Sequence, residues 1–237
     1  MAGAESASPA KANHPYDALT PDVVLDAVDA TGLRADGRLL ALGSYENRVY
    51  QLGLEDEGFV VAKFYRPGRW SDAAIHEEHA FTLELAEHEI PAVPPMRLPE
   101  GGTLAEFAGF RLAVFERRGG RPPELDDPSV LEWLGRFIGR IHAQGSVSNF
   151  TERPLLDLNS FGIQPGLFLL EGSWPPAELR AEYEKTLNAV LDGVRASFDA
   201  AGEIRQIRLH GDCHPGNVMW TDAGPHFVDF DDACTGP

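Results

Sequence analysis

Residues 210–217 read HGDCHPGN, and residues 227–232 read FVDFDD. Asp212 and Asn217 are separated by a short stretch that contains a proline and a glycine, which predicts a tight loop. The turn-forming residues 221–224 separate two short strand-like runs, so a β-hairpin is expected to bring the second stretch back towards the first. The sequence therefore predicts that acidic side chains and an amide meet in one place.

The residue types at this place are those that phosphoryl transfer needs. A protein contributes to that reaction mainly by positioning its groups and neutralising charge, with one carboxylate to orient the attacking hydroxyl and accept its proton. Mg²⁺ prefers oxygen ligands and bridges to substrate phosphates rather than to a full protein cage. Asp212 is the predicted catalytic base and Asn217 a predicted metal ligand. Asp229 is predicted both to bind the metal and to take part in catalysis.

A zinc site is an alternative interpretation of His210, Cys213 and His214. Zinc sites normally need three or four convergent ligands, and no second cluster with ligand spacing occurs in the sequence. We therefore interpret His210 as a hydrogen-bonding brace of the loop. Asp231 is expected either to bind the metal or to cap a turn, and the sequence leaves both open.

Composition and charge limit the class of protein. The chain has 237 residues, of which 43% are hydrophobic and 24% charged, as in ordinary globular proteins. Its net charge of −17 disfavours nucleic acid and anionic membranes as partners. No apolar run has the length of a membrane span, and residues 1–13 are small and polar, which predicts a disordered tail and no secretory signal. Only two cysteines occur, so a cytoplasmic location is expected.

The first half of the chain is patterned as a small antiparallel sheet with helices. Thr20 followed by Pro21 is typical of a helix start, and short turns force neighbouring strands to be antiparallel. Strands are predicted at 38–43, 48–54, 59–65, 96–98 and 110–116, with a helix at 72–89.

The second half is predicted to be mainly helical. Residues 117–128 hold three prolines and two glycines, which indicates a hinge or linker. Helices are predicted at 129–143 and 176–201, with a loop region between them that contains Phe161 and Phe168. In the first helix the apolar spacing predicts that Leu131, Leu134, Ile138 and Ile141 face a core, and Trp133 is also expected in the core. The predicted organisation is a tail at 1–13, an N-terminal nucleotide-binding lobe at 14–116, the linker at 117–128 and a C-terminal catalytic lobe at 129–237.

Four stretches together carry a family resemblance. These are SYENRVYQ (44–51), VAKFYRPGRW (61–70), EEHAF (77–81) and LHGDCHPGNV (209–218). The chain resembles the kinase-like phosphotransferases, a group that includes aminoglycoside phosphotransferases and choline kinases, and within it the stress response kinase A family of bacteria. The resemblance covers residues 14–237 and implies an α+β, bilobal, protein-kinase-like fold.

The resemblance gives roles to two upstream residues. Lys63 lies in a strand-like run and is placed to contact the α- and β-phosphates of ATP, as the third-strand lysine of kinases does. Its expected partner is Glu78, which shares the apolar face of Ile75 and Leu85, whereas Glu77 does not. A strand lysine that only packs its stem on the surface is the alternative.

The loop expected to cover the phosphates departs from the protein-kinase pattern. GSYENRV (43–49) holds one glycine and no G-x-G-x-x-G motif. The resemblance implies that Ser44 and the turn amides contact phosphate oxygens of ATP, and turn amides are able to form anion-binding concavities. A plain hairpin turn stabilised by the side chains of Ser44 and Asn47 is the alternative.

The function implied by the resemblance is transfer of the γ-phosphate of ATP, with Mg²⁺, to Ser and Thr hydroxyls of proteins in a stress response. The protein itself is expected to be a phosphoprotein. A kinase of small molecules such as amino alcohols or aminoglycosides is the alternative, and a nucleotide-binding module without turnover is another. A metal-dependent hydrolase is disfavoured by Lys63 and Glu78.

The sequence ends at Pro237, eight residues after Asp229. Kinase-like folds carry further helices beyond the metal-binding loop, so the C-terminal lobe is expected to be truncated. We expect apolar stripes of the helices at 129–143 and 176–201 to be exposed as a result, with low stability or self-association and weak turnover. A complete chain is expected to be a monomer.

Overall fold

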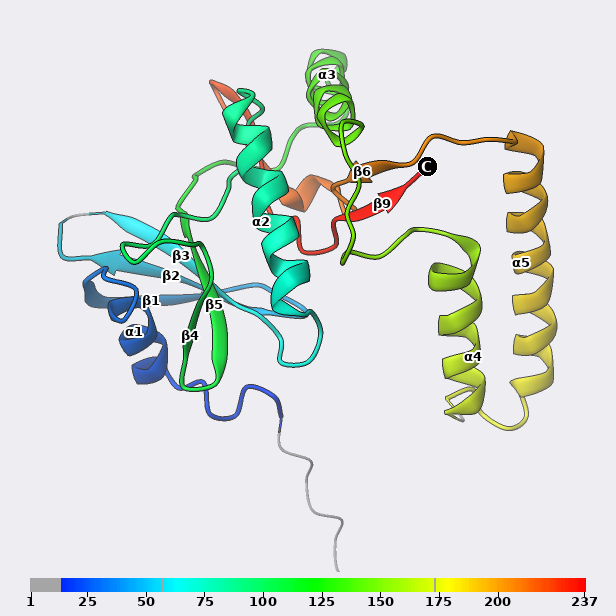
Figure 1. The fold of residues 1–237 in the computed structure, drawn as a ribbon, viewed down its shortest axis with the longest axis horizontal. Coiled ribbons are helices and arrows are strands. Elements are labelled where there is room, and N and C mark those ends of the chain that lie inside the picture. Colours follow the sequence, from blue (N-terminus) through cyan, green and yellow to red (C-terminus); the bar gives the residue numbers. More distant parts are fainter. Residues whose placement is uncertain (1–13, 57, 173) are drawn as a thin grey trace, which may run out of the picture. The chain divides into compact units, whose positions relative to one another are not determined.

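The computed structural model describes residues 14–56, 58–172 and 174–237. The tail predicted at 1–13 lies outside these residues. The chain forms two compact units (Figure 1). Unit 1 comprises the residues up to Trp70 together with Pro95–Arg117, and unit 2 comprises Ser71–Pro94 and Arg118–Pro237. The lobe boundaries derived from the sequence stay a prediction.

Unit 1 is built on one five-stranded antiparallel sheet in the order β1-β2-β3-β5-β4. The three consecutive strands β1 to β3 are joined by short turns, which allow only antiparallel neighbours. The strands are β1 (Ala35–Leu42), β2 (Arg48–Leu54), β3 (Phe59–Phe64), β4 (Ala105–Phe107) and β5 (Phe110–Glu116).

One face of this sheet is covered by α1 (Pro21–Asp29). The Thr20 side chain accepts a hydrogen bond from the Val23 N–H, which confirms the predicted N-cap. The helix buries one side against alternate residues of the strands, as the two periodicities require. The buried core includes Val24, Ala27 and Val28 of α1 and Leu52, Val60, Ala62, Phe64, Leu112 and Val114 of the sheet.

The strand predicted at 96–98 does not form. Around this stretch, the Met96 N–H donates a hydrogen bond to the Val114 oxygen at 2.7 Å, but residues 96–98 do not form a ladder with β5. The last strand of the sheet is β4 instead, joined to β5 by a two-residue turn. Ala108 and Gly109 in that turn have φ values of 50° and 80°, the left-handed conformations of a tight hairpin that matches the strand twist.

Unit 2 combines helices with two small two-stranded sheets, which pair β6 with β9 and β7 with β8. Residues 215–217 form one turn of 3₁₀ helix. The other elements are α2 (Asp72–Glu87), α3 (Pro128–Gly145), α4 (Gln164–Glu171), α5 (Arg180–Ala201), β6 (Ile207–Leu209), β7 (Val218–Thr221), β8 (Gly224–Phe227) and β9 (Cys234–Gly236).

The core of unit 2 gathers residues from α2, α3 and the C-terminal hairpin. Leu134 and Ile141 of α3 are buried as the helical periodicity predicted. Leu131, which the same pattern placed in the core, is 48% exposed, and Trp133, which was also expected in the core, is 50% exposed. The buried stripe of α3 is therefore narrower than its apolar stripe.

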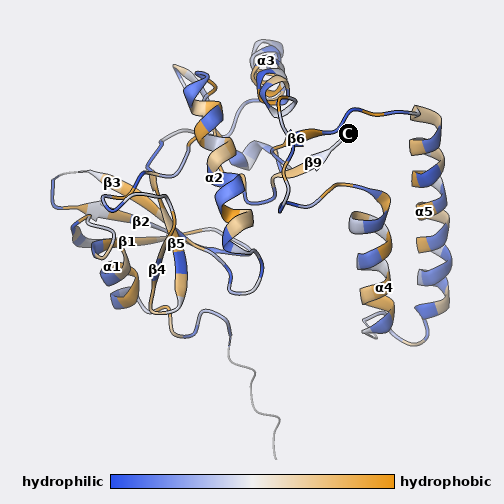
Figure 2. Cartoon of the chain, in the orientation of Figure 1, coloured by the Kyte–Doolittle hydropathy of each residue, from blue (hydrophilic) through white to orange (hydrophobic). Residues whose placement is uncertain are grey.

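Residues 159–171, predicted as a loop, are helical. A π-helical turn at Asn159–Ile163 leads into α4, which lies beside α5 (Figure 1). Among the described residues of α5, none is buried, and polar and apolar residues are mixed along its length (Figure 2). Over the parts of the chain that the structure describes, no helix combines the length and apolarity needed to cross a membrane.

Candidate phosphotransferase site

The loop after β6 holds Asp212 in a tight, hydrogen-bonded turn. The His214 N–H donates to the Asp212 main-chain oxygen at 3.0 Å, and the Asn217 N–H donates to the His214 oxygen at 2.9 Å. The His214 ring accepts from the Gly216 N–H at 2.9 Å and so caps the 3₁₀ turn at 215–217. This local network brings Asp212 and Asn217 together, as their spacing predicted.

The side chain of Asn217 orients the loop further. Its Nδ2 donates to the main-chain oxygen of Asp212 at 2.9 Å and lies 3.5 Å from the Asp212 Oδ2. Because the nitrogen end of the amide faces Asp212, the amide oxygen remains for a different ligand. The Asp212 carboxylate is exposed, so a hydroxyl group from outside has access to it.

The β7–β8 hairpin returns Asp229 to this loop. The Val228 N–H donates to the main-chain oxygen of Asn217 at 3.0 Å, and the Val228 oxygen lies 3.0 Å from Nε2 of His210. Asp229 has a φ of 59°, a conformation that residues other than glycine rarely adopt. Strained positions of this kind cluster at functional sites, where the surrounding structure enforces them.

His210 is buried and contacts both the loop of Asp212 and the segment that carries Asp229. Its ring packs against the Phe230 ring, with 4.2 Å between the centroids and 34° between the ring planes. Burial lowers the pKa of His210 and outweighs the opposing effects of the Val228 hydrogen bond and the Asp229 and Asp212 charges. A neutral ring that donates through Nε2 to Val228 agrees with the predicted bracing role.

Gly211 is a further residue of the candidate site, which the sequence analysis did not identify. It has a φ of 86°, and a Cβ built there would lie 1.8 Å from the main-chain oxygen of Asp232. The catalytic loop and the segment after Asp229 thus approach closely, and only glycine allows this. The glycine between His210 and Asp212 in the HGD motif was the available signal.

The oxygen donors of this site fit Mg²⁺. The Asp229 carboxylate and the Asn217 amide oxygen are hard ligands of the kind that Mg²⁺ prefers. In the described parts of the chain, no three His, Cys, Asp or Glu side chains converge on a common metal position. An ion held by these two residues would complete its shell with water and phosphate oxygens. Of the two aspartates in this segment, Asp229 is exposed, as a metal ligand that must meet a nucleotide has to be, whereas Asp231 is buried with 4% of the residue exposed.

The other predicted residues lie on separate elements. Lys63 in β3 is 5% exposed, pairs across the sheet with Val49 and Ala113, and has its Nζ 4.9 Å from the Tyr65 ring centroid. Glu78 in α2 is 2% exposed and lies on the apolar face of that helix, as predicted. Lys63 belongs to unit 1 and Glu78 to unit 2, and their pairing stays a prediction.

Ser44 lies in the turn between β1 and β2. Its hydroxyl donates to the Asn47 oxygen at 3.1 Å, and the buried Asn47 side chain accepts from the Arg66 N–H at 3.1 Å. Glu46 also forms an ion pair with Arg66 at 2.5 Å. The turn is thus held by the Ser44 side chain from within and by contacts of Asn47 and Glu46 with Arg66 after β3. The contact of Ser44 with phosphate stays a prediction.

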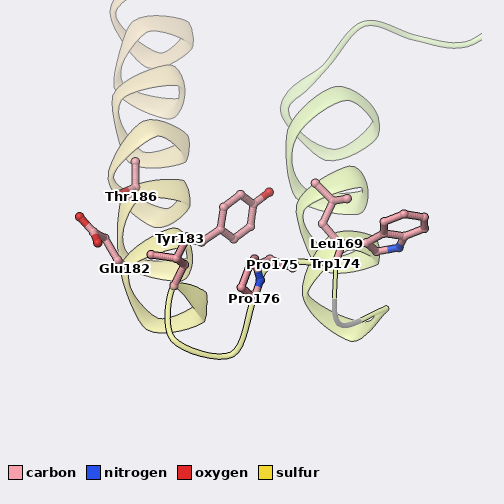
Figure 3. Close-up of a pocket in the computed structure, with 8 residues that line it drawn as sticks. Leu169, Trp174, Pro175, Pro176, Glu182, Tyr183 and Thr186 are labelled. Atoms are coloured by element: carbon pink, nitrogen blue, oxygen red, sulfur yellow. The ribbon is translucent and has the colours of Figure 1, made fainter.

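A separate pocket of about 550 Å³ lies between α4 and α5 (Figure 3). It is lined mainly by Leu169, Trp174 and Leu179 with Tyr183. None of the predicted site residues is among its lining residues, so the volume of this pocket does not mark the predicted chemistry.

Comparison with known proteins identifies the family of this chain. Residues 38–237 match the phosphotransferase enzyme family. Stress response kinase A of Escherichia coli strain K12 is 41% identical over 222 residues, which cover 94% of this chain and 66% of that protein. The serine/threonine protein kinase RdoA of Salmonella typhimurium is 40% identical over the same shares. The chain thus spans 66% of the length of these relatives.

Solved structures share the fold at low sequence identity. An amicoumacin kinase in complex with AMP-PNP, Ca²⁺ and its ligand has a TM-score of 0.70 at 21% identity, covering 90% of this chain and 64% of that one. A microcompartment-associated aminopropanol kinase has a TM-score of 0.71 at 19% identity, covering 91% and 71%. These similarities confirm the predicted α+β kinase-like fold class.

Proposed function

The chain belongs to the phosphotransferase enzyme family, and we propose that it transfers the γ-phosphate of Mg-ATP to Ser and Thr hydroxyls of proteins. The observation that carries this proposal is the joined arrangement of the two loops. Asn217 donates its side-chain N–H to Asp212, and its main-chain oxygen accepts from Val228, which precedes Asp229. The predicted base and the predicted metal ligands are therefore held by one network.

The roles follow from this arrangement. The acceptor hydroxyl donates its proton to the Asp212 carboxylate as its oxygen bonds to the γ-phosphorus. The bond between that phosphorus and the β–γ bridging oxygen breaks, and ADP leaves with the electron pair. The Asn217 amide oxygen and the Asp229 carboxylate would hold a Mg²⁺ ion, which when bound would supply charge neutralisation for the phosphates. Lys63 and Ser44 are the proposed phosphate contacts of the nucleotide.

Two acceptor classes have support. The name of the Salmonella relative, a serine/threonine protein kinase, favours protein hydroxyls. The aminopropanol kinase among the structural neighbours favours a small amino alcohol, and the net charge of −17 would attract such a cation. The Salmonella relative, at 40% identity, outweighs neighbours near 20%, so protein acceptors are the first proposal.

The test is an incubation with γ-labelled ATP and Mg²⁺ in the presence of generic protein acceptors or of amino alcohols. Labelled Ser or Thr in protein supports the proposal, and label only in the small molecule supports the second acceptor class. Asp212→Asn is the matched control, since it keeps the shape of the side chain but removes the base. Loss of a general base lowers the rate by about 10²–10⁴. Near-wild-type transfer in that variant would refute the role of Asp212.

A further inference from the structure

Glu77, which the helical pattern set aside, anchors a loop in unit 2. Its Oε1 accepts hydrogen bonds from the Thr151 N–H at 2.7 Å and from the Thr151 hydroxyl at 2.6 Å. Its Oε2 accepts from the N–H groups of Glu152 at 2.9 Å and Arg153 at 3.0 Å. One carboxylate of α2 thus fixes three consecutive residues, 151–153, through both of its oxygens.

The charge of Glu77 is part of this anchor. Burial acts to raise the pKa of its carboxyl, but the hydrogen bonds from Thr151, Glu152 and Arg153 outweigh burial and lower the pKa. Hydrogen bonds that favour the ionised form have this effect, because a carboxylate is a stronger acceptor than a carboxylic acid. Glu77 is therefore ionised and bonded to the loop around neutral pH.

Arg153 extends from the anchored loop to the segment that follows Asp229. Its side chain is buried, with 5% of the residue exposed. The guanidinium Nε donates to the Ala233 oxygen at 2.8 Å, and Nη2 donates to the Asp231 oxygen. The planar fork of arginine holds two main-chain carbonyls in one geometry, which a lysine ammonium cannot reproduce.

Main-chain pairing extends this contact. The Leu156 N–H donates to the Thr235 oxygen at 2.7 Å, and the Thr235 N–H donates to the Pro154 oxygen at 2.9 Å. Thr235 lies in β9, whose other edge pairs with β6, the strand that leads into the catalytic loop. The segment 153–156 therefore supports the residues after Asp229 on the side away from β6.

From these contacts we infer that Glu77 and Arg153 are positioning residues for the metal-binding loop, defined here as residues 228–233. The inference rests on the proposed function, because it concerns the metal ligand Asp229. On one side of Asp229, Val228 is held by Asn217 and His210. On the other side, the carbonyls of Asp231 and Ala233 are held by Arg153, which Glu77 fixes in turn.

The strained conformation of Asp229 makes this support necessary. A φ of 59° in a non-glycine residue persists only when flanking contacts enforce it. If the carbonyls after Asp229 are released, the residue relaxes and its carboxylate leaves the direction needed for the metal. Partners that orient metal ligands affect metal affinity or activity by about 10- to 100-fold when they are removed.

The test uses three variants. Arg153→Lys keeps the charge and removes the fork, and Glu77→Gln keeps the shape and places an amide against the loop N–H groups. Arg208→Lys is the matched control. Arg208 is equally buried, at 5% exposed, and its side chain bonds to Glu84 and Gln144 rather than to the metal-binding loop. Hydrogen exchange of residues 228–236 and calorimetric titrations of ATP at several Mg²⁺ concentrations are measured for each.

We expect faster exchange at 228–236 in Arg153→Lys and Glu77→Gln, and a rise of about tenfold or more in the Mg²⁺ concentration for half-maximal ATP binding. The double variant should be little worse than either single one, because the two residues act in one network. Arg208→Lys should lower the melting temperature without changing the Mg²⁺ dependence or the exchange of residues 228–233. Thr235 is left out of this comparison because it pairs with Arg208 across β6 and β9.

Two results would overturn the inference. One is unchanged exchange at 228–236 in Arg153→Lys, and the other is a shift in Mg²⁺ dependence that Arg208→Lys reproduces. Failure of the wild-type chain to bind Mg-ATP would instead refute the proposed function. The exchange measurement needs no nucleotide, so it would still show whether Glu77 and Arg153 hold the metal-binding loop in place.

Discussion

Replacing Gly211 with alanine adds only one methyl group but should strongly disrupt the site. The added Cβ would lie 1.8 Å from the main-chain oxygen of Asp232, whereas real Cβ contacts are essentially never under 3.0 Å. The obstacle is backbone rather than the end of a flexible side chain. Either the loop of Asp212 or the segment after Asp229 must therefore move by more than an ångström.

Two costs add at this position. A left-handed conformation costs an L-residue about 1–2 kcal/mol. Forcing extra atoms into a packed site typically costs about 1–3 kcal/mol. The sum of about 2–5 kcal/mol is a large share of the roughly 5–15 kcal/mol that stabilises a typical domain. Gly224→Ala isolates the first cost, because Gly224 has a φ of 114° and a Cβ added there would meet no atom within 4 Å.

Urea unfolding of both variants measures the difference. With a slope of about 2 kcal/mol per M, Gly211→Ala should lower the midpoint by about 1–2.5 M and Gly224→Ala by about 0.5–1 M. Phosphate transfer should fall further in Gly211→Ala than loss of folded protein explains, since Asp212 and Asp229 are displaced together. Equal midpoints for the two variants would refute the close approach of the loops.

Three further outcomes are expected. Asp229→Ala should weaken ATP binding about tenfold or more in Mg²⁺ but little in EDTA, because it removes a metal ligand, and calorimetry checks both. Lys63→Ala should weaken nucleotide affinity and transfer; unaltered binding and transfer in a folded variant would contradict its role. Burial acts to raise the pKa of Glu84, but hydrogen bonds from Arg208 and Gln144 lower it below the ordinary value of a glutamate. The stabilising effect of Glu84 is therefore present above the ordinary glutamate pKa of about 4.3 and is lost as pH falls through the lowered pKa, so the free energy of unfolding of Glu84→Gln should depend less steeply on pH below about 4.3.

The sequence predicted the local parts of the site well. Asp212 and Asn217 meet because the six-residue loop 212–217 closes through its own hydrogen bonds. The β7–β8 hairpin was predicted from the turn-forming residues between its strands, and it carries Asp229 back. Thr20 caps α1 for an equally local reason. Patterns of this kind succeed because the contacts that form them lie within a few residues.

The predictions that were wrong concern features that depend on contacts between segments distant in the sequence. The run at 96–98 is strand-like in composition, yet β5 pairs instead with β4, which a two-residue hairpin brings close. Leu131 and Trp133 continue the apolar pattern of α3, but the groups packed on that helix cover a narrower stripe. Residues 159–171 hold a proline and two glycines and were interpreted as a loop, although proline is well tolerated in the first turn of α4. Periodicity records what a segment is able to bury, and its neighbours decide what it does bury.

The adjacent residues Glu77 and Glu78 on α2 show that sequence patterns also miss contacts near the candidate site. Consecutive helical residues point about 100° apart, so Glu78 and Glu77 cannot serve the same surface. The apolar pattern singled out Glu78 because it shares the buried face, and it gave Glu77 no role. Glu77 finds its partners 74 to 76 positions away, and Arg153 finds its own 78 and 80 positions away. Nearly all of those partners are main-chain N–H and C=O groups, which every residue carries and no sequence motif marks. The support of the metal-binding loop could therefore be recognised only once the fold had brought these segments together.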